Sequence, residues 1–110
     1  MSTAEPRSIE PATVFAALGD PTRLALVRKL CDGQSRSIAT LAADTELTRQ
    51  AVTKHLAVME DAGLVASERV GRESRYAFRP DAIEEARACL DAVSRQWDDA
   101  LMRLKRFVED

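Results

Sequence analysis

The sequence predicts a mainly α-helical domain with one β-hairpin, an α+β fold in the order α-α-α-α-β-β-α. Apolar residues recur every three or four positions along most of the chain, and they alternate only over residues 64–79. The last apolar stripe, from Ile83 to Val108, predicts a helix on the order of 40 Å long. With 110 residues, of which 45% are hydrophobic, the chain fits a single domain with a modest core.

The N-terminal end is polar, so we expect a flexible arm over residues 1–10 and a single domain over residues 11–110. The first predicted helix covers residues 12–18 and stops at Gly19. Asp20, a good N-cap residue followed by proline, begins the second helix. Its expected inward residues are Leu24, Val27 and Leu30.

A third helix, capped by Ser35 or Ser37, is joined by a short turn to a fourth helix that begins after Thr48 and stops at Gly63. Two helices joined in this way form a helix-turn-helix. The inner residues of the fourth helix are Val52, Leu56 and Met59, and its other faces carry Arg49, Gln50, Thr53 and Lys54. Arginine and glutamine can bond base edges in pairs, whereas threonine and lysine reach phosphate, so this helix is suited to the major groove of DNA.

A basic hairpin follows directly, with strands over residues 64–70 and 74–79 and a turn at Gly71-Arg72-Glu73. A helix-turn-helix followed by such a hairpin is a winged helix-turn-helix. The residues that we predict to bind DNA are Thr48, Arg49, Gln50, Thr53, Lys54, His55, Arg72 and Arg75. Arg49 and Gln50 would read bases with Thr53 in support, while Lys54 and the wing arginines would hold phosphate or enter the minor groove.

The last helix is predicted over about residues 81–109, with Asp81 and Glu84 as a capping box. Its apolar stripe is longer than so small a body can cover, so we expect a homodimer, although the N-terminal helix alone could cover it. The predicted dimer interface contains Val14, Phe15, Leu90, Val93, Trp97, Leu101 and Leu104.

The net charge is −2, but residues 23–79 carry ten basic and seven acidic side chains, a local excess of +3. DNA responds to a local basic face, so the composition is compatible with double-stranded operator DNA as the partner. No apolar run approaches the ~20 residues that cross a bilayer, and the N-terminus lacks the pattern of a secretory signal. We therefore expect a cytoplasmic protein with no membrane partner.

Catalytic and metal-binding motifs are missing from the sequence. His55 is the only histidine, the four glycines form no phosphate loop, and no nucleophile is linked to a base, so we predict neither an enzyme nor a cofactor nor a metal site. Cys31 and Cys89 are interpreted as small buried apolar residues, with a redox switch between them as the alternative.

Five segments together resemble the ArsR/SmtB family of bacterial repressors: Leu18-Gly19-Asp20-Pro21-Thr22-Arg23-Leu24, Leu41-Ala42, Thr53-Lys54-His55-Leu56, Ala62-Gly63-Leu64-Val65 and Gly71-Arg72-Glu73-Ser74-Arg75-Tyr76. The resemblance implies a dimer whose first and last helices pair, and which leaves a palindromic operator when an inducer binds. It also implies that His55 packs under the recognition helix or donates to phosphate. Residues 37–42 lack the Cys-x-Cys pair of the family's soft-metal sensors, and the last helix lacks histidine, which indicates a branch without the usual metal ligands.

We therefore predict a sequence-specific, DNA-binding transcription regulator, a dimeric repressor of its own or a neighbouring operon. Its inducing signal would be a small organic effector, another non-metal signal or none. Two alternatives remain open: a thiol-based redox-responsive repressor that uses Cys31 and Cys89, and a winged helix that serves as a protein-interaction module.

Overall fold

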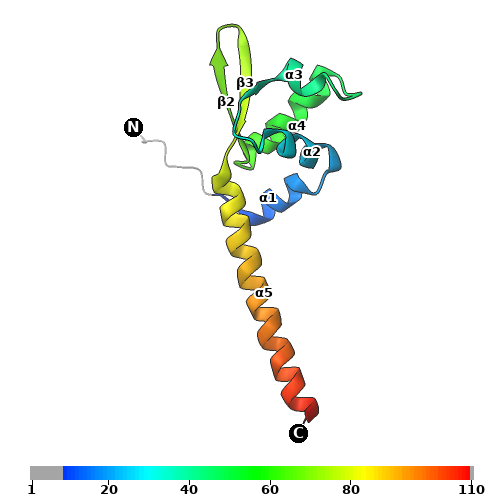
Figure 1. Cartoon of the computed structure of the whole chain (residues 1–110), viewed down its shortest axis with the longest axis vertical. Coiled ribbons are helices and arrows are strands. Elements are labelled where there is room, and N and C mark those ends of the chain that lie inside the picture. Colours follow the sequence, from blue (N-terminus) through cyan, green and yellow to red (C-terminus); the bar gives the residue numbers. More distant parts are fainter. Residues whose placement is uncertain (1–8, 110) are drawn as a thin grey trace, which may run out of the picture.

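The computed structural model of the chain describes residues 9–109. A small helical body carries the hairpin at one end, and the last helix projects from the body at the other (Figure 1). In chain order the elements are α1 (Pro11–Leu18), α2 (Pro21–Leu30), β1 (Arg36–Ser37), α3 (Ile38–Ala42), α4 (Arg49–Asp61), β2 (Val65–Val70), β3 (Glu73–Phe78) and α5 (Pro80–Glu109). The predicted winged helix-turn-helix fold is confirmed, with the strand β1 as an addition.

The sheet of the wing is antiparallel and has the strand order β1-β3-β2. The unpredicted strand β1 pairs Arg36 with Tyr76 and Ser37 with Arg75. A strand of two residues is too short to show alternation in a sequence, so only its pairing with β3 reveals it. Because β1 runs directly into α3, this pairing attaches the base of the wing to the start of the helix-turn-helix.

Side-chain caps fix where the helices of the body begin. The side-chain oxygens of Asp20, Ser37 and Thr48 accept backbone N–H bonds of 2.9, 3.1 and 3.0 Å, so Ser37 rather than Ser35 caps α3. Each cap stabilises its helix by about 1 kcal/mol. Gly63, with φ of +82°, ends α4 in the left-handed conformation that a residue with a Cβ adopts only with strain.

The core contains side chains from every helix of the body. Its largest fully buried members are Val14, Leu26, Leu30, Leu41, Val52, Leu56, Met59, Leu64 and Val65. The prediction for Leu24 was wrong, because α2 is rotated so that Leu26 faces the core and Leu24 is 43% exposed. Residues 1–8 of the predicted arm lie outside the described residues, and Ile9 is partly buried against the core.

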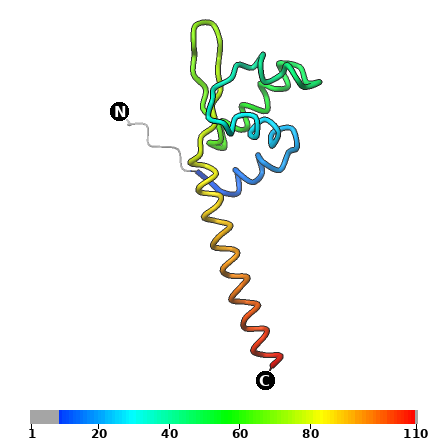
Figure 2. The backbone as a smooth tube through the Cα atoms, viewed as in Figure 1, coloured from blue at the N-terminus to red at the C-terminus, as the bar shows by residue number. Residues whose placement is uncertain are grey.

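Among the described residues, the body contacts α5 along its first turns, where the small residues Ala82 and Ala86 are buried. It begins at Pro80, so Asp81 lies inside the helix and pairs with Arg79 at 3.3 Å instead of capping it. The capping-box prediction was therefore wrong. Beyond Ala86 the chain continues as one straight helix away from the body (Figure 2). Within residues 9–109, no helix combines the length and apolar character that a membrane crossing requires.

Candidate nucleic-acid interface

Buried side chains and local hydrogen bonds together fix the turn between α3 and α4. Leu41 of α3 and Val52 and Leu56 of α4 have no exposed surface, so the two helices share one packed seam. The hydroxyl of Thr45 donates to the Ala42 carbonyl at 2.9 Å and accepts from the backbone N–H of Leu47 at 3.2 Å. These contacts hold α4 at a fixed angle to α3 and leave its other side open to solvent.

The outer strip of α4, defined here as Arg49, Gln50, Thr53 and Lys54, is exposed. Its members lie four residues apart in two pairs, 49 with 53 and 50 with 54, so they share one side of the helix. In the part of the chain that the structure describes, neither Arg49 nor Lys54 forms an ion pair. The first turn of α4 contains no acidic residue, so the positive end of the helix dipole is not neutralised. The strip is therefore free to meet an anionic surface.

The two threonines beside this strip use their hydroxyls locally. The Thr48 oxygen accepts from the Ala51 N–H as the cap of α4, so its part in any DNA contact is to set the start of the helix. The Thr53 hydroxyl donates to the Arg49 carbonyl at 2.7 Å, which leaves only its lone pairs for an external donor.

The wing presents a cation at its tip. Val70 pairs with Glu73 across a two-residue turn of Gly71 and Arg72. Gly71 has φ of +62° and no other residue type has positive φ in the described chain, which is the arrangement of a type II′ hairpin turn. Arg72 is exposed and unpaired among the described residues. Arg69, which is not among the predicted DNA-binding residues, is also exposed and without an ion pair among the described residues. Strand alternation places it on the same face of β2 as the buried Val65, so the sequence pattern does not indicate its exposure.

Arg75 is engaged within the protein. Its Nε and one terminal nitrogen donate to the hydroxyl and the carbonyl of Ser35 at 3.1 and 2.8 Å, and its other terminal nitrogen pairs with Glu73 at 3.2 Å. The side chain is 32% exposed. Arg75 therefore fastens the wing to the loop before β1, a role that the sequence analysis did not predict.

His55 lies on the side of α4 that faces α2. Its Nδ1 atom is 3.4 Å from a terminal nitrogen of Arg23 and 4.0 Å from a carboxylate oxygen of Asp20, and its side chain is 24% exposed. We expected His55 either to pack under the recognition helix or to donate to phosphate. In the structure it packs under the helix, against α2.

The loop after α2 is held by an ion pair. Arg36 donates to both carboxylate oxygens of Asp32, at 2.9 and 2.6 Å, and to the Lys29 carbonyl at 2.8 Å. The Arg36 guanidinium, followed by the backbone N–H of Gln34, lowers the pKa of Asp32 from 3.8 to about 2. Lys29 in turn forms an ion pair with the exposed carboxylate of Asp44. Arg36 and Lys29 are therefore engaged in holding the loop and are not free for DNA.

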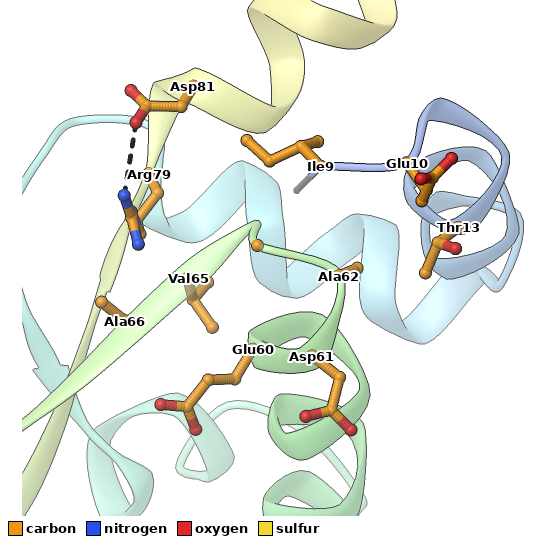
Figure 3. A pocket seen from close by; sticks show the side chains of 11 residues that line it. Ile9, Glu10, Thr13, Glu60, Asp61, Ala62, Val65, Ala66, Arg79 and Asp81 are labelled. Atoms are coloured by element: carbon orange, nitrogen blue, oxygen red, sulfur yellow. Dashed lines mark hydrogen bonds and ion pairs between the residues drawn. The ribbon is translucent and has the colours of Figure 1, made fainter. Parts of the chain in front are cut away.

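A cavity of about 640 Å³ lies where the start of α1, the end of α4 and the start of α5 meet (Figure 3). Its charged lining is Glu10, Glu60, Asp61, Arg79 and Asp81, and Arg79 is paired with Asp81. Among the described residues the charged side chains that line it are mostly carboxylates, and the cavity is at the opposite end of α4 from Arg49. It is therefore not part of the nucleic-acid interface.

The predicted dimer residues divide into two groups. Val14 has no exposed surface because it is part of the protomer's own core, so the structure removes it from the predicted interface, and Phe15 is partly buried beside it. On α5 the exposed fractions are 55% for Leu90, 40% for Val93, 65% for Trp97 and 57% for both Leu101 and Leu104. Met102, Phe107 and Val108 extend the exposed apolar surface to the end of the helix.

The cysteines differ in exposure. Cys31 follows the last turn of α2 as its C-cap and is exposed, which corrects the expectation that it is buried, whereas Cys89 on α5 is partly buried. Both are free thiols. Among residues 9–109, no three side chains of histidine, cysteine, aspartate or glutamate converge as a metal site would require.

Comparison with known proteins agrees with this geometry. A family model described as bacterial regulatory protein, arsR family, matches residues 20–67, which contain the whole helix-turn-helix. The HTH-type transcriptional regulator Rv2034 of Mycobacterium tuberculosis is 32% identical over 99 residues, 90% of this chain and 89% of that protein. The HTH-type transcriptional repressor SmtB of the same species is 34% identical over 98 residues, 87% of this chain and 70% of that protein.

A solved structure shows the same arrangement. The ArsR-like transcriptional regulator from Rhodococcus sp. RHA1 superposes with a TM-score of 0.77 at 36% identity, over 88% of this chain and 91% of that one. The fold, the matched helix-turn-helix and relatives that cover nearly the whole chain all agree. The chain belongs to the arsR family of bacterial regulatory proteins and is a DNA-binding transcriptional regulator.

Proposed function

We propose that this protein is a repressor that binds a palindromic operator as a homodimer and is released by a signal other than a metal ion. The observation that carries the proposal is the outer strip of α4, which is exposed and whose cations form no ion pair among the described residues, on a helix whose opposite side is buried. A solvated helix face commonly pairs its cations with acids three or four residues away. Within α4, Arg49 and Lys54 have no acid at those spacings.

The positions of the exposed side chains support a division of roles. Arg49 and Gln50 lie in the first turn of α4, which in a helix-turn-helix meets base edges. Lys54 lies one turn further on and Arg72 lies at the tip of the wing, so both are suited to phosphate. We add Arg69 to the phosphate-binding set and assign Arg75 to support of the wing, because its nitrogens already have partners.

The apolar stripe of α5 supports a homodimer. Leu90, Trp97 and Leu104 repeat every seven residues, with Val93 and Leu101 between them, and all five are at least 40% exposed. A continuous apolar surface on this scale marks an interaction site. A second copy brings an identical stripe, and the two recognition helices would then enter successive major grooves ~34 Å apart.

The release signal is proposed from donor chemistry. Tight binding of zinc or arsenic requires converging thiolates or imidazoles, and this chain has two cysteines and one histidine. Cys31 lies at the end of α2, whereas His55 lies beneath α4. The side chains beside His55 are Arg23 and Asp20 and not a thiol. A small organic effector, or oxidation of the thiols, accounts for release without such a site.

The test is a fluorescence-anisotropy titration of the protein with the DNA upstream of its own gene, at two salt concentrations. Tight, salt-sensitive binding to this DNA and not to a scrambled duplex is the expected result. Parallel titrations with oxidant, chelator or zinc rank the signals: we expect no response to the two metal treatments. Release by zinc would refute the non-metal signal. Equal affinity for both duplexes would refute autoregulation and favour a distant operator or a protein partner.

A further inference from the structure

A three-residue network joins the recognition helix α4 to the two helices beneath it. Arg23, in the first turn of α2, donates from Nε to the Ala17 carbonyl at 2.8 Å and from one terminal nitrogen to the Ala16 carbonyl at 3.4 Å. These carbonyls belong to the last turn of α1, where no helical partner is available to them. The guanidinium is therefore held in place by α1 before it reaches α4.

The remaining arm of Arg23 reaches the recognition helix. Its other terminal nitrogen lies 3.4 Å from Nδ1 of His55. A guanidinium can only donate, so this bond requires an imidazole whose Nδ1 carries no proton. The hydrogen bond consequently exists only while His55 is neutral, with its proton on Nε2.

We propose that Arg23 and neutral His55 are positioning residues that hold α4 in its operator-binding orientation, and that protonation of His55 releases this latch and weakens operator binding. The inference rests on the proposed function. It differs from a role in DNA contact because His55 faces α2 and touches Arg23 and Asp20, whereas the outer strip lies on the exposed side of α4.

The charged groups around His55 determine what protonation does. From α2 it faces Arg23 and the cap residue Asp20, α1 contributes backbone carbonyls through Arg23, and the residues three and four positions away on α4 are uncharged. A protonated ring cannot accept from Arg23 and places a second cation beside it. Asp20 attracts a protonated ring from 4.0 Å, but the same carboxylate oxygen accepts the Arg23 N–H at 2.9 Å as the cap of α2, so a closer ion pair with His55 would compete with that cap.

The pKa of Asp20 is consistent with this arrangement. The backbone N–H of Arg23, more than the nearby charges of Arg23 and His55, lowers it below its ordinary value of 3.8. Asp20 is therefore a carboxylate throughout the range in which histidine changes charge, and His55 is the group that switches the network.

The direction of the pH effect separates the latch from ordinary electrostatics. Acidification makes the protein more positive, which by itself strengthens binding to DNA. A histidine that contacted phosphate would act in the same direction. Weaker binding in acid is expected only if the protonated form of His55 disturbs the position of α4.

The experiment measures operator affinity between about pH 8 and about pH 5.5, the range in which histidine titrates. On acidification the operator affinity of the wild type should fall about fivefold to tenfold. This factor corresponds to the loss of one partly exposed hydrogen bond, the one between Arg23 and His55. His55→Asn keeps an acceptor at the position of Nδ1 but cannot be protonated, so its affinity should not fall. His55→Gln is the matched control, because its acceptor lies one bond further from the backbone; it should bind weakly at every pH.

A second measurement needs no DNA. His55 is the only histidine, so one imidazole signal in the proton NMR spectrum reports its titration. The amide signals of α4 should move with the same midpoint in the wild type, and Arg23→Lys should show the acid-like positions already at about pH 8. If Arg23→Lys does not fold, the comparison of the wild type with His55→Asn decides.

The outcomes are distinguishable. Operator affinity that is constant or rises in acid, or an equal loss in His55→Asn, overturns the latch while leaving the proposed function intact. If the wild type binds no operator at either pH, the proposed function fails. The latch is then judged by NMR. Chemical shifts of the α4 amides that do not change as the His55 imidazole signal titrates would overturn it.

Discussion

Replacing Trp97 by alanine tests whether the projecting part of α5 is an interface between two copies. Trp97 is 65% exposed, in the middle of the apolar stripe. The exposed tryptophan surface in excess of alanine is on the order of 100 Å², worth about 2.5 kcal/mol when buried at about 25 cal/mol per Å². A two-fold interface contains the residue twice. Allowing for incomplete burial, we expect a loss of about 2 to 4 kcal/mol per dimer, a roughly 30-fold to 1,000-fold weaker association.

The assay combines sedimentation equilibrium with intrinsic fluorescence. Trp97 is the only tryptophan, so its emission in the wild type should shift to longer wavelength as dilution separates the protomers. Arg95→Ala is the matched control, because this exposed residue lies on the side of α5 opposite the stripe. A dimer equally stable in Trp97→Ala and the wild type, or an emission spectrum that is independent of concentration in a protein that does dimerise, would refute the assignment.

Three further predictions concern the operator and the fold. Gln50→Ala should cost about 1 to 3 kcal/mol against the operator and relax its base preference, measured by anisotropy with single-base operator variants. Arg72→Ala should weaken all duplexes alike and lower the slope of log affinity against log salt by about one; a specificity change with an unchanged slope would contradict this role. Because the pKa of Asp32 is lowered from 3.8 to about 2, its bond to Arg36 stabilises the fold above pH 3.8 and is lost as the pH falls toward 2. Asp32→Asn should therefore lower the melting temperature at pH 5, and the difference from the wild type should vanish near pH 2, as measured by circular dichroism; a constant difference would contradict this.

The elements of the fold could be predicted because their signals are local. Asp20, Thr48 and Gly63 mark helix ends through bonds to residues within four or five positions, and they do so in the structure. The predictions for Leu24 and Asp81 failed for a related reason, since a rotation of one helix or a start one residue earlier changes a side chain's role without changing the pattern. The strand β1 exists only through β3, some 40 residues away in sequence, and no local rule reveals it.

For the candidate site too, the features that depend on local spacing could be predicted, and those that depend on remote partners could not. The outer strip of α4 follows from helical spacing, which places it opposite the buried residues Val52, Leu56 and Met59. Spacing does not reveal which of the basic residues are already paired. Arg75 and Arg72 are three positions apart in one hairpin, yet the first is bonded to Ser35 and the second has no partner in the described chain.

The assignment of cations to DNA therefore depends on partners that are remote in sequence. Ser35 is 40 residues from Arg75, and Arg23 is 32 residues from His55, so both pairs form only when the fold brings α2 and its following loop against the wing and α4. Each pairing engages a residue of the predicted contact set within the protein, and we propose that it helps to orient the element that carries the remaining contacts. The same comparison explains Arg69, which becomes a candidate because the structure gives it no partner among the described residues. We therefore expect a basic residue of this fold to contribute to DNA binding when the tertiary structure leaves its charge unpaired.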